Sequence, residues 1–519
     1  MTAPFVILAE IDMVSPVGVA TTLRFSDQPI RPFAPTEPGA SNLAYDERIV
    51  EAPALKRSLF DDLASLSPGL GYGEMALVNA DRALDAYKAH AWGELRVFRW
   101  TEGTPRAAAE PVLKGLCGQP GFPVTTKEPG RVRVPLWDYR AELEKPLQEV
   151  VYAGTNGTGG VLYEGAVDGL KGRRKPLAWG DLTDAHVPAP QVNAGVLAYQ
   201  PAAMAVAGPI SIFDRGAPAG FVSDGDYAGA AFDAHAPAAA HSATDLARGL
   251  VKLNGQTVGQ VAFGLKGASA GGYVETTGPV LARLLAQAGV PAGRIGASVA
   301  ALASPAVVGA WFETEDARTA VGWVARSAPA ALLPSRLGVW EAYLFGPPAA
   351  VADLKIADDE ILDLEEDGTA PAPAGEIRVG WGRIYTGYRQ ADLAPALTGT
   401  EAVERLTSDY RWAVIEDATV KARHPRTWRK IEITTALRRQ ADAQALAARL
   451  QGMFGLSPAG EPRRMLRVTV ELTAERLAAG LGQTVEIAGG ELGAGGRFVL
   501  LGEEPMRPRR DLVVWTLWG

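Results

Sequence analysis

The sequence is short of cysteine, of positive charge and of long apolar runs, and each shortage excludes a class of protein. Cys117 is the single cysteine of 519 residues, so one chain can form no internal disulfide, no thiolate zinc cage and no four-cysteine iron–sulfur centre. We interpret Cys117 as a small buried apolar residue. No stretch approaches the roughly 20 apolar residues of a membrane-spanning helix.

Acidic residues outnumber basic ones, with 59 Asp and Glu against 51 Lys and Arg and a formal net charge of −8. Because affinity for phosphate needs a basic surface, this balance argues against a general nucleic-acid binder. The first residues carry a short apolar run without a basic segment before it, and Glu10 and Asp12 follow, so no signal peptide is indicated. We expect a soluble protein made in a cytoplasm, with no membrane span.

Glycine and proline are abundant, at 58 and 37 residues, while 47% of the chain is hydrophobic. This composition is that of a globular protein with many turns, which favours short strands over long helices. A chain of this length is too long for one core, so we expect three or four domains that are mostly β.

The last stretch has the clearest pattern. Leu466, Val468, Val470 and Leu472 alternate with polar residues, which indicates a half-buried strand. Three further strands are predicted at 483–487, 497–501 and 512–518, separated by turns at Gly489-Gly490, Gly495-Gly496 and Pro505 to Pro508. The sequence therefore predicts a closing antiparallel β unit whose terminus, Trp518-Gly519, is packed.

The first third of the chain also predicts strands, at 5–11 and 19–25 as a pair, then at 49–59, 94–100, 131–136 and 150–152. Asn79, Asp81 and Asp85 follow one strand-like run. We interpret them as a turn whose side chains bond their own backbone, with a calcium site as the alternative.

Two segments carry residues typical of ligand sites. Gly154 to Gly160 is glycine-rich, but the strand-like run Val161–Glu164 follows instead of a helix, so we predict a hairpin at Asn156-Gly157 in place of a phosphate loop. Asp233, His235 and His241 lie in an Ala-rich stretch. We interpret that stretch as an exposed loop, with a zinc site as the alternative.

The one enzyme-like motif is Gly-Ala-Ser-Ala-Gly at 267–271, which matches the nucleophile elbow G-x-S-x-G around Ser269. In an elbow the helix begins directly after the serine. Here 272–276 has the pattern of another strand and a helix is predicted only near Thr277. His424, the sole histidine downstream, lies in a probable turn, so we favour a glycine-rich hairpin over a hydrolase.

Helical spacing predicts one helix over 279–288 and another that begins at Thr314, with that threonine as its cap. A strand is predicted at 338–345, then an acidic connection over 353–367, and then a strand over 376–385 with Ile377, Val379 and Trp381 on one face. The acidic stretch starts like a calcium loop, but its twelfth position is Ala374 instead of glutamate.

Several segments in order resemble one family. They are the strand and Asn-Asp turn at 73–85, the basic step and strand at 171–180, the Asp-Arg-Gly strand end at 210–216, Asp224 to Tyr227, the Ala-rich helix 438–453 and the strands at 481–487, 497–502 and 512–519. This succession resembles the tail-tip or baseplate hub proteins of long-tailed bacteriophages or related gene transfer agents.

The resemblance implies a mostly β fold with an α/β insert, built of small β-barrel or sandwich units. It implies four parts: an N-terminal β domain (1–165), a β domain with a basic first strand and a variable loop (166–270), an α/β insert (271–370) and a C-terminal β domain with one helix (371–519).

The resemblance also implies a structural virion protein without catalytic, cofactor-binding or metal-binding residues. It would form a homo-oligomer, a trimer, assembled in the cytoplasm of a bacterial host and located at the tail tip of the virion. Its partners would be the distal tail protein, the tail tube or tape measure, and tip or fibre proteins, while phage DNA passes without sequence-specific binding along neutral or acidic walls. The alternatives are a distal tail ring, a receptor-binding tail protein, or a serine hydrolase through Ser269.

Overall fold

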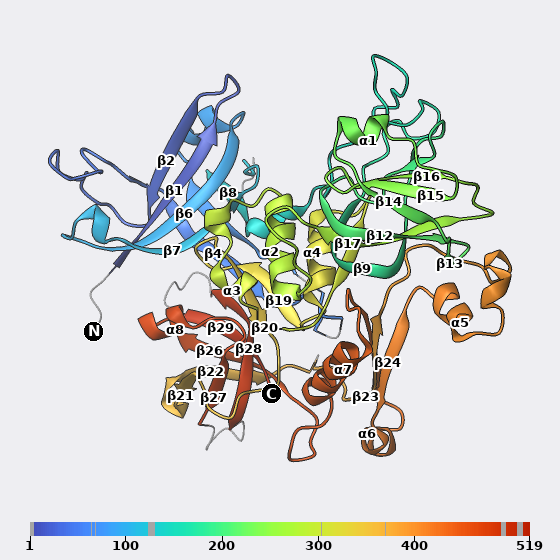
Figure 1. The fold of residues 1–519 in the computed structure, drawn as a ribbon. Coiled ribbons are helices and arrows are strands. Elements are labelled where there is room, and N and C mark those ends of the chain that lie inside the picture. The colour runs from blue at the N-terminus through green and yellow to red at the C-terminus, as the bar shows by residue number, and fades with distance from the viewer. Residues whose placement is uncertain are drawn as a thin grey trace. The chain divides into compact units, whose positions relative to one another are not determined.

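The chain forms two compact units, each built from separate stretches of sequence. A computed structural model describes residues 5–63, 65–67, 69–122, 130–302, 304–368, 370–488, 495–505 and 512–519. The first unit comprises Met1–Glu142, Leu332–Pro371 and Ser457–Gly519, and the second comprises Leu143–Ala331 and Ala372–Leu456 (Figure 1). Strands dominate both units, so the prediction of a mostly β, multi-part protein is confirmed.

The first unit contains one large mixed sheet. Its strand order is β3-β2-β1-β6-β7-β8-β5-β4-β28-β29-β26-β22, and β27 joins β28 and β21 beside this path. The elements are β1 (Phe5–Val14), β2 (Ala20–Ser26), β3 (Asp46–Glu47), β4 (Ile49–Ser58), β5 (Tyr72–Val78), β6 (Ala91–Thr101), β7 (Glu110–Cys117), β8 (Arg131–Trp137), β20 (Trp340–Leu344), β21 (Leu354–Ile356), β22 (Ile361–Glu366), β26 (Met465–Glu471), α8 (Ala474–Ala478), β27 (Thr484–Ile487), β28 (Gly496–Pro505) and β29 (Leu512–Trp518).

The N-terminal strands enclose a core because their side chains alternate between two faces. β1 pairs with β2 in antiparallel register, as the sequence predicts. β3 and β4 are separated by Arg48 alone. β3 pairs with β2, and β4 pairs with β5. Cys117 is buried in this core, as expected, and burial raises the pKa of its thiol to about 12.

The C-terminal β unit is confirmed. Leu466, Val468 and Val470 are all buried in β26, which pairs antiparallel with β29. Arg464 and Gly519 exchange two backbone hydrogen bonds of 2.7 and 3.1 Å, so the end of the chain is tied down. The turn predicted at 489–490 and most of the turn predicted at 505–508 lie outside the described residues.

The second unit holds three sheets, ordered β10-β11-β16-β15-β14, β13-β12-β17-β9-β18 and β24-β23-β25. β19 and β20 form a separate two-stranded sheet. The elements are β9 (Leu177–Pro188), β10 (Gln191–Asn193), β11 (Ala198–Tyr199), β12 (Val206–Asp214), β13 (Ala217–Pro218), β14 (Val222–Asp226), α1 (Ala230–Ala234), β15 (His241–Asp245), β16 (Leu250–Asn254), β17 (Val261–Ala268), α2 (Thr277–Gln287), α3 (Ala297–Ala300), β18 (Gly309–Phe312), α4 (Ala317–Ala325), β19 (Ala330–Pro334), β23 (Ala374–Trp381), α5 (Glu401–Thr407), β24 (Arg411–Glu416), α6 (Ala418–Arg423), β25 (Arg429–Thr434) and α7 (Gln440–Phe454).

The helices of the second unit follow the predicted apolar spacing, with one correction. α2 packs against α4, and Ala317, Ala320, Val321 and Val324 of α4 are buried as expected. The cap of α4 is Asp316, whose Oδ1 accepts the Thr319 N–H at 2.7 Å, and not Thr314. A carboxylate two residues later therefore takes the capping role and moves the helix start to Ala317.

Several further predictions along the chain are wrong. In the described part of the chain, no pair of strands flanks Asn156-Gly157 or Ser269 to form the hairpins predicted there, and the Ala-rich stretch predicted as an exposed loop contains α1 with Phe232 buried. Segments 161–164 and 272–276 contain no strand, and 150–152 makes only an isolated bridge between Val151 and Arg174. Gly271 and Gly272 adopt positive φ of 74° and 89°, which keeps that segment in a turn. The acidic stretch predicted as a connection instead contributes β22, which pairs with β26. Among the described residues, no helix is long and apolar enough to cross a membrane.

Candidate functional site

Ser269 does not sit in a nucleophile elbow. It follows β17 in a turn, where its N–H donates to the Ala205 carbonyl at 2.9 Å, and α2 begins only at Thr277. No hydrogen bond between described residues joins Ser269 to a histidine, and His424 lies at the end of α6. The arrangement therefore lacks the base and the helix start that the elbow chemistry requires.

The Asn79 segment forms the predicted turn. The Asn79 side-chain oxygen accepts the Leu84 N–H at 2.9 Å, and its amide donates to Asp85 at 2.8 Å. Arg48 pairs with Asp81 at 2.7 Å. These side chains bond one another and the backbone instead of facing a shared cation position.

The histidines of the Ala-rich stretch meet a carboxylate that sequence reasoning did not group with them. His235 and His241 both contact Asp224, at 3.0 and 2.5 Å, whereas Asp233 pairs with Arg248 at 2.7 Å. Hydrogen bonds from His241 and then His235 lower the pKa of Asp224. Within the described part of the chain, no group of three or more His, Cys, Asp or Glu side chains is placed to hold a metal ion.

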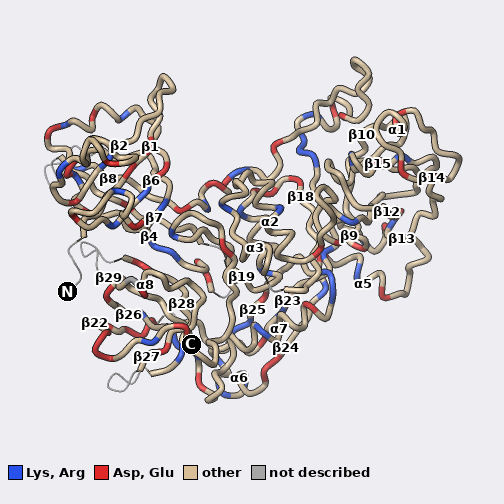
Figure 2. Tube along the Cα trace, turned by 60° about the vertical axis from the view of Figure 1, so that its left-hand side comes forward, with Lys and Arg blue, Asp and Glu red and all other residues tan. Residues whose placement is uncertain are grey.

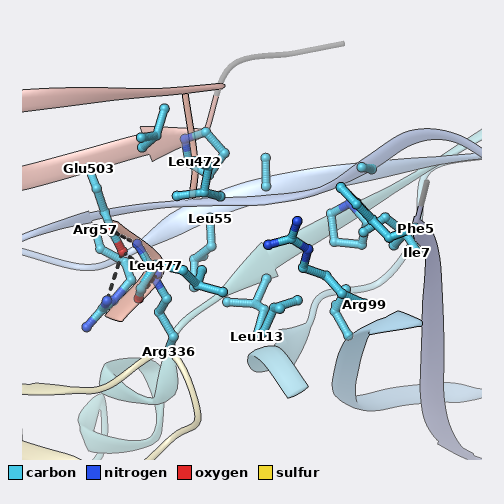
Figure 3. A pocket seen from close by; sticks show the side chains of 17 residues that line it. Phe5, Ile7, Leu55, Arg57, Arg99, Leu113, Arg336, Leu472, Leu477 and Glu503 are labelled. Atoms are coloured by element: carbon cyan, nitrogen blue, oxygen red, sulfur yellow. Dashed lines mark hydrogen bonds and ion pairs between the residues drawn. The ribbon is translucent and has the colours of Figure 1, made fainter. Parts of the chain in front are cut away.

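A buried charge cluster lies where three separate stretches of the first unit meet (Figure 3). Arg57 on β4 donates to Glu503 on β28 at 2.9 Å, and Arg336 donates to the same carboxylate at 2.9 Å through Nε. Arg57 also donates to the Pro334 carbonyl at 2.9 Å. β4 and β28 pair directly beside this cluster, with Arg57 opposite Glu503. The cluster therefore joins the N-terminal, middle and C-terminal stretches at one point.

Two arginines decide the charge state of Glu503. Burial alone raises the pKa of a carboxyl, but the charges of Arg336 and Arg57 and their hydrogen bonds outweigh burial and lower the pKa of Glu503 to about 2. The side chain of Glu503 is 4% exposed. Glu503 is thus an anion at neutral pH inside the protein. Its role is structural, because Arg57 and Arg336 already bind both of its oxygens.

A small apolar cavity of about 110 Å³ adjoins the cluster. Phe5, Ile7, Leu55, Leu113 and Leu477 contribute to its wall, and the Arg99 guanidinium lies 4.1 Å from the centre of the Phe5 ring (Figure 3). A cavity of this size is smaller than the roughly 300 Å³ or more typical of small-molecule sites. It is a packing gap between the N-terminal and C-terminal strands of one unit.

Several strands of the described part of the chain end their sheets, among them β22, β14 and β24. β22 ends the large sheet of the first unit, and β14 and β24 end two sheets of the second; within the described part of the chain nothing pairs with their outer sides. Each carries an exposed apolar side chain: Leu362 is 58% exposed, Val222 56% and Val414 46%. Unpaired backbone groups beside apolar side chains form a template for pairing with another chain.

Sequence reasoning missed both the cluster and the edges. Arg57 and Glu503 are 446 positions apart, so no local motif connects them. The acidic residues of β22 have the composition of a connection, although Leu362 and Leu364 alternate with Asp363 and Glu365 in a period of two. That alternation was the signal that could have identified the strand.

Comparison with known proteins gives structural neighbours only. No family and no curated protein matches the chain. A tail protein from Neisseria meningitidis is 9% identical, with a TM-score of 0.43 over 98% of this chain and 96% of that one. The 43 kDa tail protein of prophage MuSo2 from Shewanella oneidensis is 10% identical, with a TM-score of 0.39 over 98% of each chain. Prophage tail protein gp18 from Listeria monocytogenes is 7% identical, with a TM-score of 0.35 over 98% and 94%. These neighbours are tail proteins, the class that the sequence resembles.

Proposed function

We propose that this chain is a structural subunit of a phage tail, the tail-tip or baseplate hub, which assembles with copies of itself. The observation that carries the proposal is the set of open strand edges, β22, β14 and β24, on units whose own chain segments are firmly joined. A catalytic protein needs a constellation of reactive groups, whereas an assembly subunit needs self-complementary edges. The role is structural and not enzymatic.

The buried Arg57–Glu503–Arg336 cluster supports this role because it ties the first and last stretches of the chain into one unit. A subunit that connects a tail tube to the tip or fibre proteins is under mechanical force. Its terminal strands must therefore stay folded. The hub would line the DNA exit path without sequence-specific binding, and the net charge of −8 fits neutral or acidic walls.

The test is the symmetry of the assembly. We expect the purified chain, or particles that contain it, to show threefold rings at the tail tip by cryo-electron microscopy. Sixfold rings would move the chain to the distal tail ring, and binding to host-surface carbohydrate without a ring would favour a receptor-binding tail protein. A chain that stays monomeric in particles, with esterase activity that Ser269→Ala abolishes, would overturn the proposal.

A further inference from the structure

A basic segment lies at one end of the small sheet β24-β23-β25 of the second unit (Figure 1). There α6 follows β24 and leads through a short turn into β25. We call residues 418–430 the basic tip, because they include five Lys and Arg residues and no Asp or Glu, in a chain whose net charge is −8. The five residues, which are blue in Figure 2, are Lys421, Arg423, Arg426, Arg429 and Lys430.

Hydrogen bonds fix the backbone of the basic tip. The His424 carbonyl accepts the N–H groups of Thr427 at 3.1 Å and of Trp428 at 2.9 Å, which closes the turn after α6. The Arg429 N–H then donates to the Pro373 carbonyl at 3.1 Å and ties the turn to the residue before β23. The cations of the tip are therefore presented from an ordered turn, so little backbone entropy is lost when they bind a partner.

Acidic residues of the sheet neutralise the two lysines of the tip. Lys421 pairs with Glu416 at 3.0 Å, and Lys430 pairs with Glu432 at 2.8 Å. Glu376 lies 3.9 Å from Lys421 and 4.0 Å from Lys430. These carboxylates come from β23, β24 and β25, and the lysine charges are already used within the unit.

The arginines of the tip differ from its lysines. Arg423 and Arg426 are exposed and Arg429 is half-buried. Among the described residues, the side chains of Arg426 and Arg429 have neither an ion pair nor a hydrogen bond. A cation in the last turn of a helix offsets the helix dipole, but Arg426 and Arg429 lie beyond the end of α6 at Arg423. Both guanidinium groups are therefore available to an anion, and a phosphate can accept two parallel hydrogen bonds from each.

The apolar side chains of the tip face inward, which decides between kinds of anionic partner. Val420 is fully buried, and the Trp428 ring packs on the Gly375 backbone, where an added Cβ would lie 2.9 Å from it. The Lys421 Nζ lies 4.9 Å from the centre of the same ring. No large apolar side chain of residues 418–430, all of them described, is exposed. A membrane-binding segment inserts apolar side chains and a protein partner needs an apolar anchor, whereas a nucleic-acid backbone needs only cations.

We propose that the basic tip binds the phosphate backbone of duplex DNA, with the guanidinium groups of Arg426 and Arg429 on phosphate oxygens. Phosphate contacts carry no sequence information, so the binding is independent of base sequence. Two or three contacts give weak binding that releases readily, which is compatible with DNA that passes the protein. The inference rests on the proposed function for the choice of DNA, because DNA is the polyanion that a tail tip would meet.

The test measures how the affinity of the full chain for a fluorescein-labelled DNA duplex depends on salt, with binding followed by anisotropy. With a duplex of about 20 base pairs we expect the logarithm of the affinity to fall linearly with the logarithm of the salt concentration, with a slope of about −2 to −3. Arg426→Gln should reduce the size of this slope by about 1, and Arg426→Gln with Arg429→Gln by about 2. Two duplexes of unrelated sequence should bind equally.

Arg31→Gln is the matched control, because Arg31 is exposed and has no ion pair among the described residues but belongs to the first unit. It removes the same charge and should leave the slope unchanged. Arg426→Lys keeps the charge at the tip and should keep the slope of the wild type. Thermal unfolding checks that each variant is folded, and if the double variant unfolds, Arg426→Gln alone decides, since Arg426 is exposed in a turn.

Equal slopes for the wild type, Arg426→Gln and the control would overturn the inference, as would the absence of binding at about 20 mM salt, where screening is weak. Tighter, Arg426-dependent binding to phosphatidylglycerol vesicles than to the duplex would also overturn it and assign the tip to a membrane surface. Threefold rings without DNA binding would defeat the inference and leave the proposed function standing. Arginine-dependent DNA binding by a chain that forms no ring would support the tip and defeat the hub.

Discussion

Glu503 accepts hydrogen bonds from arginines that belong to two other stretches of the first unit, Arg57 and Arg336. An ion pair as deeply buried as this one gains little net stability over a well-packed apolar core, because both charges lose their hydration. Removing one partner is different, since the remaining charges stay buried without compensation. The cluster therefore favours one pairing of the strands, and removing one of its charges lowers the free energy of unfolding.

Glu503→Gln should destabilise the first unit by about 3–5 kcal/mol, because it leaves Arg57 and Arg336 buried without an anion. The measurement is urea unfolding followed by tryptophan fluorescence. Glu504→Gln is the matched control: Glu504 is the next residue, is 46% exposed and pairs with Lys56 at the surface. A loss below about 1 kcal/mol in Glu503→Gln, equal to that of the control, would show that the cluster does not hold the unit.

The same carboxylate predicts an acid dependence. The pKa of Glu503 is lowered to about 2 in the folded chain, against an ordinary value of 4.5. A lowered folded-state pKa contributes stability that is present above about pH 4.5 and is lost as the pH falls toward 2. We expect the free energy of unfolding of the wild type to fall more steeply over this range than that of Glu503→Gln. Parallel pH profiles for the two proteins would contradict this expectation.

At the scale of elements, period-two alternation predicted β26 and the buried face of β23, while strand composition on both sides of a turn predicted β1 and β2. The strand predicted over 272–276 is absent. Gly271 and Gly272 have positive φ, which interrupts the extended backbone although the residues that follow have strand composition. The prediction also failed for β22, where charge suggested a connection. Exposed edge strands are rich in charge, so their composition is close to that of a loop.

The open edge of β22 predicts a change in association. Leu362→Lys places a charge on the exposed side of this edge and should weaken self-assembly while leaving the fold intact, because edge lysines oppose strand addition. Multi-angle light scattering at several concentrations measures the effect. Val17→Lys is the control, since Val17 is 85% exposed in the turn between β1 and β2. Equal association of both variants and the wild type would exclude β22 as a contact.

At the scale of the whole molecule, the sequence could predict the mostly β class and the packed C-terminus, but not which distant stretches share a unit. Arg57, Arg336 and Glu503 illustrate why. Each lies in an unremarkable local context, and only the pairing of β4 with β28 brings them together. Contacts of such large sequence separation leave no periodic signal. The division of the chain into four domains, at 1–165, 166–270, 271–370 and 371–519, stays a prediction.

The interleaved units predict an asymmetric effect of truncation. A chain that stops after Leu456 loses β26–β29. This removes β26 from beside β22, β28 from beside β4, and the anion between Arg57 and Arg336. The second unit ends at Leu456 and keeps its own buried clusters, such as that of Leu182, Phe263 and Leu265. We expect differential scanning calorimetry to show the loss of one cooperative transition and the retention of the other, because each unit has its own core. If the truncated chain instead unfolds in a single transition with the same enthalpy as the full chain, the C-terminal strands do not complete the first unit. The contact between the two ends of the chain would then not stabilise that unit.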